Sequence, residues 1–277
     1  MQIKLLEDVF GTTLLRRSAQ GAVPTEAGRV LQKHSKRVIK NLSQAHKELA
    51  ELRGSGEIRL TLGITTTSGK ELVGPMLAAI KSRPSLKKFQ LTFREGKSDD
   101  LLDLLRERKI DAALSYEDSG EHRFHVTVLY SEQFVLVGTP KALKGRSGTV
   151  ALDEIGEFPL VMSPAEEGGR RFIEEAAMRR HARLNVDTEI SSALLKQEML
   201  FQHRKCMIVP RARFAAEIRT GKLSMLQLSP PLSRTKLFVL RSMPRTTHEI
   251  LRSLVKKSVE QRMIASETGW LPAGSGP

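Results

Sequence analysis

Residues 57–116 decide the fold class, because five segments here alternate between two hydrophobic patterns. The extended patterns are EIRLTLGIT at 57–65, FQLTFRE at 89–95 and IDAALSY at 110–116, and the helical ones are GPMLAAIKSR at 74–83 and SDDLLDLLRER at 98–108. Short alternating or continuous apolar runs favour strands, whereas apolar residues three and four apart favour helices. This alternation predicts an open α/β fold.

The same alternation continues through the rest of the chain and predicts a second α/β lobe. The elements expected after residue 116 are strands at 126–130, 133–138, 158–163, 185–190, 206–210 and 237–242, and helices at 169–182, 192–203 and from His248 to about Met263. We therefore expect one domain at 56–265, with lobe I at about 56–137 and 238–265 and lobe II at about 138–237. The Gly- and Pro-containing tail at 266–277 is expected to be disordered.

Upstream of this domain, a long helix is predicted from Thr25 to about Arg53. Thr25 suits the N-cap position, and Glu26 places a carboxylate at the positive end of the helix dipole. Apolar side chains form an a/d pattern over more than three heptads: Leu31, Val38, Ala45 and Leu52 in one series, Leu42 and Leu49 in the other, which Ser35 interrupts. Such a pattern needs a partner helix. The alternative is a helix lying on the chain's own core, but no comparable helix could receive it, so we favour self-association through 25–55.

The N-terminal part is the most basic part of the chain. Residues 1–53 contain ten basic and five acidic side chains, whereas the other 224 residues carry a net charge of +9, so the charge per residue is about twice as high at the front. Met1 to Phe10 predicts a short helix ended by Gly11. Thr12–Leu15 and Ala22–Val23 predict a hairpin with Arg16 and Arg17 near its tip. An anion-binding surface is therefore expected here.

Composition excludes several classes of protein. The chain has 277 residues, of which 40% are hydrophobic and 5% aromatic, and a net charge of +14. These values exclude wholesale disorder and argue against a surface of stacked aromatics for single strands or RNA. No apolar run reaches the length of a membrane span, and the N-terminus lacks a signal-peptide pattern. We expect a cytoplasmic protein that does not bind membranes.

The residue types that carry chemistry do not form a catalytic or metal-binding pattern. One cysteine, Cys206, excludes a disulfide framework and a cysteine-built zinc site. His122 and His125 lie close in sequence, but no third ligand is nearby, so we expect neither a metal nor a cofactor. A Cys206–His203 nucleophile is the alternative to a buried structural thiol; the apolar CMIVP context favours burial. No nucleophile elbow, P-loop or H-E-x-x-H motif occurs, which argues against an enzyme.

Several short motifs follow one another in a fixed order. They are Gln2-Ile3, Leu6-Glu7, Gly11, Leu14-Leu15, Arg17 and Thr25-Glu26-Ala27-Gly28 at the front, then Glu95-Gly96, Asp111-Ala112-Ala113-Leu114, Phe134–Val137, Glu189-Ile190-Ser191 and Gly221-Lys222-Leu223. In this order the chain resembles a LysR-type bacterial transcriptional regulator over nearly its whole length. The front motif is specific, and the later motifs are individually weak.

The resemblance implies a winged helix-turn-helix, a linker helix and a two-lobed effector domain like the periplasmic binding proteins. Residues 1–24 then correspond to the end of the recognition helix and the wing. Gln2 and Lys4 are the candidates for base-edge and phosphate contacts, and Arg16 and Arg17 would neutralise DNA phosphates. The alternative is that these four side chains are ordinary solvated surface groups.

The chain departs from the family pattern at its start. The family places two helices before the Gln-Ile pair, and here only Met1 precedes it. A helix-turn-helix holds its reading helix in the major groove by packing it on the first helix. Met1 is therefore either a misplaced start inside a longer gene, which we favour, or the start of a truncated product. Duplex DNA is expected as a partner if the missing N-terminus is present.

Two departures also fall in the sensing half. Arg108 stands where the family often has a glycine after the second helix, and His203-Arg204-Lys205 stands where it often has a Gly-x-Gly. A residue other than glycine at positive φ costs about 1 kcal/mol. We therefore expect the local turns to differ.

Ligands of open α/β sheets bind beyond the carboxyl ends of strands. The loop Thr65-Thr66-Thr67-Ser68 follows the first strand, and hydroxyls with free helical N–H groups suit a carboxylate. We expect a helix starting near Pro75, which suits its first turn. Ser98 begins the next helix, and Ser163 follows a strand of lobe II. Thr65, Thr66, Thr67, Ser98 and Ser163 are thus the candidate effector-binding residues; the alternative is that Thr67 and Ser98 only cap helices.

We expect a ligand-responsive, DNA-binding transcriptional regulator that binds a small anionic effector between its lobes. It would form homodimers through the linker helix, possibly tetramers. One alternative is a truncated, non-DNA-binding sensor subunit that pairs with full-length relatives. Another is a stand-alone small-molecule binding protein, which would have no use for the heptad helix.

Overall fold

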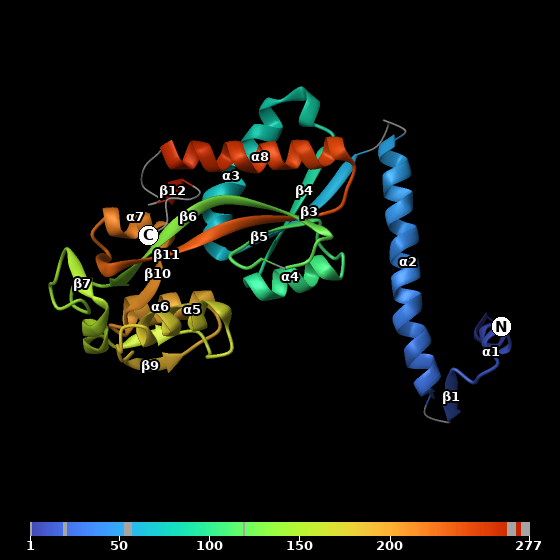
Figure 1. Ribbon diagram of the computed structural model, residues 1–277, viewed down its shortest axis with the longest axis horizontal. Coiled ribbons are helices and arrows are strands. Elements are labelled where there is room, and N and C mark those ends of the chain that lie inside the picture. The colour runs from blue at the N-terminus through green and yellow to red at the C-terminus, as the bar shows by residue number, and fades with distance from the viewer. Residues whose placement is uncertain (1, 19–20, 53–56, 119, 265–269, 273–277) are drawn as a thin grey trace. The chain divides into compact units, whose positions relative to one another are not determined.

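The computed structural model describes residues 2–18, 21–52, 57–118, 120–264 and 270–272. It divides into two compact units, residues 1–58 and 59–277. Figure 1 shows the elements of both. Within the described ranges, no helix is both long and apolar enough to span a membrane.

The first unit contains two helices and a hairpin. Helix α1 (Gln2–Phe10) ends at Gly11, whose φ is 61°. Strands β1 (Leu15–Ser18) and β2 (Gly21–Pro24) pair antiparallel. Arg16 and Arg17 therefore belong to a strand, which begins three residues later than predicted. The segment before the strand is held on α1 instead, because the Glu7 carboxylate accepts hydrogen bonds from the backbone N–H groups of Leu14 (2.7 Å) and Leu15 (3.1 Å).

Helix α2 (Glu26–Leu52) confirms the predicted long helix. Thr25 caps it: its Oγ1 accepts a hydrogen bond from the Gly28 N–H at 3.0 Å. Gly28 allows α2 to approach the hairpin, because a Cβ there would lie 2.1 Å from the Leu14 carbonyl oxygen. On the predicted apolar face, Val38 is 66% and Leu42 59% exposed. Self-association through this face stays a prediction.

The second unit is built on a mixed sheet whose strand order is β10-β6-β11-β5-β3-β4. Two of its strands, β6 (Phe124–Gly138) and β11 (Ser224–Arg241), are long enough to run through both lobes (Figure 1). The sequence predicted them as shorter separate strands. Because β6 and β11 pair with each other along most of their length, they join the two lobes as an antiparallel ribbon, whose register shifts between Gln227 and Leu232 and between Lys236 and Leu237.

Lobe I contains the other strands at one end of this sheet and three helices. They are β3 (Ile58–Ile64), β4 (Phe89–Glu95), β5 (Ala112–Ser115), α3 (Thr66–Ser82), η1 (Pro84–Leu86), α4 (Ser98–Arg106) and α8 (Arg245–Ile264). Strands β3 and β5 are parallel, as the helix crossovers require. The amphipathic helix α4 buries Leu101, Leu102 and Leu105 against Ile110 and Phe124.

Lobe II contains the remaining elements. They are β7 (Thr149–Ala151), η2 (Leu152–Glu157), β8 (Leu160–Met162), α5 (Gly168–Met178), β9 (Val186–Glu189), α6 (Ala193–Gln202), β10 (Met207–Pro210), η3 (Arg211–Phe214) and α7 (Ala215–Arg219). Strands β8 and β9 form a parallel pair, and Leu160 bridges to Cys206 beside β10. Phe158, Leu160 and Ile155 are fully buried in the main core of this lobe.

Three expectations about local structure were wrong. Pro75 lies inside α3, and the helix begins at Thr66, so Thr66 and Thr67 occupy its first turn rather than a loop. The helix continues through Pro75 because its buried face packs on the sheet and on α8. Arg108 and Arg204 adopt φ values of 56° and 51°. The turns therefore keep the left-handed conformation that glycine favours, at about 1 kcal/mol each.

The third wrong expectation is that the whole tail at 266–277 is disordered. Residues 270–272 form strand β12, which pairs with β6. Trp270 is 7% exposed and stacks on Tyr130 with ring centroids 3.9 Å apart. Aromatic packing therefore orders this segment within a composition that suggested disorder. Residues 265–269 and 273–277 lie outside the described residues.

Candidate functional site

A cavity of about 210 Å³ lies between the two lobes. All five residues predicted to bind an effector line it: Thr65, Thr66, Thr67, Ser98 and Ser163. Lobe I contributes the segments that follow β3 and β4, and lobe II those that follow β8, β9 and β10. The cavity therefore lies at the carboxyl ends of strands, where open α/β sheets bind ligands.

Four helix N-termini meet at this cavity. The starts of α3 and α4 come from lobe I, and those of α5 and α6 from lobe II. At α3, α4 and α5 no side chain caps the first turn, whereas Ser192 caps α6. Free N–H groups and the positive ends of helix dipoles favour an anion. Ser98 does not cap α4; its Oγ instead accepts a hydrogen bond from the Tyr116 N–H at 3.1 Å, and its role in effector binding stays a prediction.

Lys196 and Arg213 add two half-buried cations from lobe II. Lys196 Nζ donates to Ser163 Oγ at 2.6 Å, and Arg213 donates to the Ala193 carbonyl at 3.3 Å. Burial lowers the pKa of both side chains. Across the described residues, neither forms an ion pair within 4.0 Å with a carboxylate. A buried cation without a carboxylate partner is costly, so an anionic ligand would compensate it.

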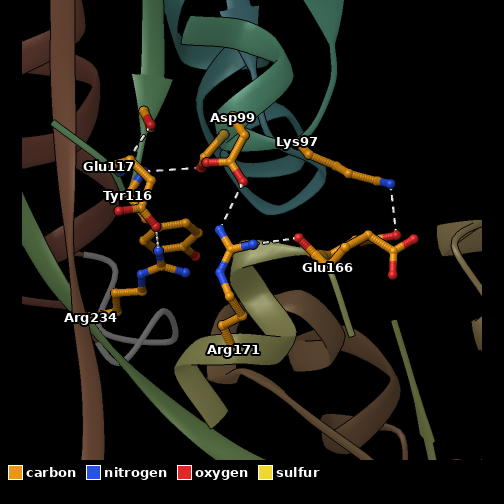
Figure 2. Close-up of polar contacts among 10 residues, drawn as sticks. Lys97, Asp99, Tyr116, Glu117, Glu166, Arg171 and Arg234 are labelled. Atoms are coloured by element: carbon orange, nitrogen blue, oxygen red, sulfur yellow. Dashed lines mark hydrogen bonds and ion pairs between the residues drawn. The ribbon is translucent and has the colours of Figure 1, made fainter. Parts of the chain in front are cut away.

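Aromatic side chains form the apolar part of the wall. Tyr116 and Phe134 line the cavity, and Phe172 packs on Phe134 at a centroid distance of 5.2 Å. The Arg234 guanidinium lies 4.7 Å from the Tyr116 ring and 5.0 Å from the Phe172 ring, and it pairs with Glu117. Figure 2 shows Arg234 beside Tyr116 and Glu117. This arrangement suits a small ligand with both an anionic group and a carbon skeleton.

Comparison with known proteins decides the family. The model of the LysR substrate binding domain matches residues 53–260. The chain belongs to the LysR family. It is 25% identical over 275 residues to the nitrogen assimilation regulatory protein nac of Klebsiella aerogenes, an alignment that covers 95% of this chain and 88% of that protein. It is 22% identical to the transcriptional activator CmpR of Synechocystis, over 82% of this chain and 74% of the relative.

Solved structures of LysR regulators share the fold. Full-length OxyR from Pseudomonas aeruginosa superposes with a TM-score of 0.65 at 19% identity, covering 93% of this chain and 83% of that one. The regulatory domain of Synechocystis CcmR in complex with 2-PG gives a TM-score of 0.63 at 14% identity, covering 72% of this chain and 97% of that one. These likenesses establish the two-lobed, periplasmic-binding-protein-like architecture of this LysR-type transcriptional regulator.

Beneath the cavity of this LysR protein lies a buried polar cluster that the sequence did not reveal. Lys236 is fully buried on β11; its Nζ lies 3.6 Å from the Glu132 carboxylate and donates to Thr65 Oγ1 at 3.2 Å. The Tyr116 hydroxyl donates to the same carboxylate. Burial lowers the pKa of Lys236 to about 8. Both Thr65 and Tyr116 line the cavity, so this cluster supports its floor.

The candidate DNA-binding residues lie in the first unit. Lys4 is exposed on α1, and Arg16 is exposed on β1. Gln2 begins α1 and Arg17 lies in β1, and their side chains lie outside the described part of the chain. Their role as DNA contacts stays a prediction.

Two other sequence inferences concern cysteine and histidine. Cys206 is fully buried, and burial raises the pKa of its thiol to about 12, which confirms the structural interpretation. His125 contacts His248, with ring centroids 4.9 Å apart. Within the part of the chain that the structure describes, no three or more His, Cys, Asp or Glu side chains are grouped to hold a metal ion.

Proposed function

We propose that this LysR-type regulator binds a small organic anion in the cavity between its lobes and changes its contacts with DNA in response. The observation that carries this proposal is the meeting of four helix N-termini with Lys196 and Arg213, which make no ion pair with a carboxylate of the described chain. Thr65, Thr66, Thr67, Ser98 and Ser163 supply neutral hydrogen-bonding groups around the anion. The protein acts by binding, in the cytoplasm, and not by catalysis.

The ligand acts through its differential affinity for open and closed lobes. A ligand that contacts Thr66 on lobe I and Lys196 on lobe II favours the closed form. Residues 56–265 serve as the effector domain in this proposal. The exposed apolar side chains of α2, such as Val38 and Leu42, mediate dimerisation, which carries the signal to DNA. Residues 1–24 contact DNA through Gln2, Lys4, Arg16 and Arg17.

The experiment is a thermal-unfolding screen with small anions, including succinate, benzoate, inorganic phosphate and 2-PG. A ligand that binds only the folded protein raises its melting temperature, and the rise grows with the logarithm of ligand concentration once that concentration exceeds the Kd. We expect at least one organic anion to do so. The double variant Thr66→Val/Thr67→Val should lose the response and keep its dimeric state in size-exclusion chromatography. An unchanged response would remove the α3 N-terminus from the site.

A second experiment tests the DNA contacts. If Arg16 neutralises a phosphate, Arg16→Ala should weaken binding to duplex DNA of any sequence and reduce the slope of log K against log salt by about one. Fluorescence anisotropy at several salt concentrations measures this slope. An unchanged slope would show that Arg16 is a solvated surface group.

A further inference from the structure

Three carboxylates line this otherwise anion-attracting cavity, those of Asp99, Glu117 and Glu167, and the Glu167 side chain is the least exposed of the three. Glu167 immediately precedes α5 in lobe II, and its side chain is 11% exposed. Its Oε1 accepts a hydrogen bond from Lys97 Nζ at 2.7 Å, and Lys97 immediately precedes α4 in lobe I. Both residues line the cavity. The pair therefore joins the lobes at the place where an anionic ligand is expected.

The negative charge of Glu167 favours the protonated form of two lysines that line the cavity, Lys97 and Lys196. The hydrogen bond to Glu167 raises the pKa of Lys97. The same carboxylate acts on Lys196 in the opposite direction to burial, which lowers the pKa of that lysine. Glu167 thus does for these lysines what the anionic group of a ligand would do: it compensates cations that the fold has partly removed from water.

Further contacts between the lobes surround this pair. The Asp99 carboxylate and the Arg171 guanidinium lie 3.4 Å apart. Figure 2 shows the two side chains pointing toward each other. Lys70 of α3 donates to the Arg213 carbonyl at 2.9 Å and lies 3.6 Å from Glu217. These contacts are more exposed than Glu167, and exposed ion pairs contribute little. Of the Lys97–Glu167, Asp99–Arg171 and Lys70–Glu217 contacts, the first therefore has the carboxylate that is most removed from water.

Resting on the proposed function, we propose that the Glu167 carboxylate is a built-in competitor of the effector. It occupies the position of the effector's anionic group in the unliganded protein, holds Lys97 and sets the ligand concentration at which the regulator responds. An anionic ligand must either displace the Glu167 carboxylate from Lys97 or bind despite the electrostatic repulsion from it.

Two opposing effects decide the outcome of removing the charge. Losing the Lys97 pair weakens the closed arrangement, but this pair is 48% exposed on its lysine side and contributes modestly. Losing the carboxylate also removes the repulsion between Glu167 and the anionic group of the ligand. This effect is the larger one, because both charges lie in one partly desolvated cavity. We therefore expect Glu167→Gln to bind an anion about tenfold more tightly than the unchanged protein.

Isothermal titration calorimetry with succinate and with inorganic phosphate tests the inference on the full chain. The matched control is Glu166→Gln, which removes the same charge from the neighbouring, exposed side chain. Its Kd should stay within about twofold, since exposed charges are screened by solvent. Glu167→Ser is a second variant, because serine retains a favourable N-cap residue for α5 if glutamine fails to fold there.

Tighter binding by Glu167→Gln or Glu167→Ser, with an unchanged control, supports the competitor role. Equal or weaker binding by both variants overturns it and leaves Glu167 as a structural ion pair, while the proposed function stands. If no anion among succinate, benzoate, inorganic phosphate and 2-PG binds the unchanged protein or any variant, the competitor role and the proposed function fail together.

Discussion

Replacing Lys196 by methionine should separate ligand binding from folding. The Lys196 ammonium is half-buried, donates to Ser163 Oγ at 2.6 Å and makes no ion pair with a carboxylate of the described chain. A hydrogen bond between charged groups contributes about 1.5–3 kcal/mol. Lys196→Met should therefore raise the Kd for a cavity-bound anion by about 10- to 150-fold.

The effect on stability should have the opposite sign. Burial lowers the pKa of Lys196, so the folded protein holds the proton less tightly than the unfolded chain. Burying the charged ammonium therefore lowers the free energy of unfolding. This loss of stability is fully present at pH 7 and disappears as the pH rises toward 10.5, the ordinary pKa of lysine. Because methionine has no proton to lose, the variant should be at least as stable as the unchanged protein at pH 7.

The assay combines calorimetric titration of the best-bound anion with urea unfolding. Lys141→Met is the control, because it removes an equal charge from an exposed side chain outside the cavity. Unchanged affinity in Lys196→Met would refute the reasoning. So would a large loss of stability, since Lys196 would then stabilise the fold by more than its single hydrogen bond to Ser163 explains.

Three further predictions concern buried groups. Cys206 should resist hydrogen peroxide in the native protein, because burial keeps it in the thiol form; sulfenic acid detected by mass spectrometry would contradict this. The pKa of Lys236, about 8, lies below the ordinary 10.5, so the free energy of unfolding should rise between pH 8 and 10.5, by about 3 kcal/mol at full deprotonation. Urea unfolding at several pH values measures this rise, which Lys236→Met should lack. Trp270→Ala should cost about 3 kcal/mol by removing the stack on Tyr130; a loss below about 1 kcal/mol would mean that β12 contributes no packing.

The lobe I half of the site was predictable because it depends on local order in the chain. Thr65 lies between β3 and α3, and Ser98 begins α4 shortly after β4; strand–helix alternation places such positions at one edge of the sheet. Ser163 was found by the same rule in lobe II. The five candidate hydroxyl-bearing residues therefore line one cavity, although their binding role awaits the experiments above.

The charged half of the site was not predictable. Lys196 and Arg213 enter the cavity from α6 and η3, and nothing in their local sequence separates them from the many solvated basic residues. Lys236 gave a weak signal, because it occupies a position in an otherwise apolar strand pattern. Its partner Glu132 lies on β6, more than 100 residues earlier, and only the pairing of β6 with β11 brings them together.

Local rules also failed where tertiary packing outweighed them. Proline favours the first turn of a helix, but the buried face of α3 extends the helix from Thr66 past Pro75. Glycine favours positive φ, yet Arg108 and Arg204 adopt it at the ends of their helices. In each case the local backbone penalty, of order 1–3 kcal/mol, is smaller than the free energy gained by burying the apolar face of the helix.

The most direct test of the effector site is a crystal structure of the protein with the anion that stabilises it most. We predict that the ligand lies between the lobes, with its anionic group within hydrogen-bonding distance of the N-termini of α3 or α4 and of Lys196. Density for the ligand elsewhere, with this cavity unchanged, would contradict the assignment of the site and the mechanism built on it.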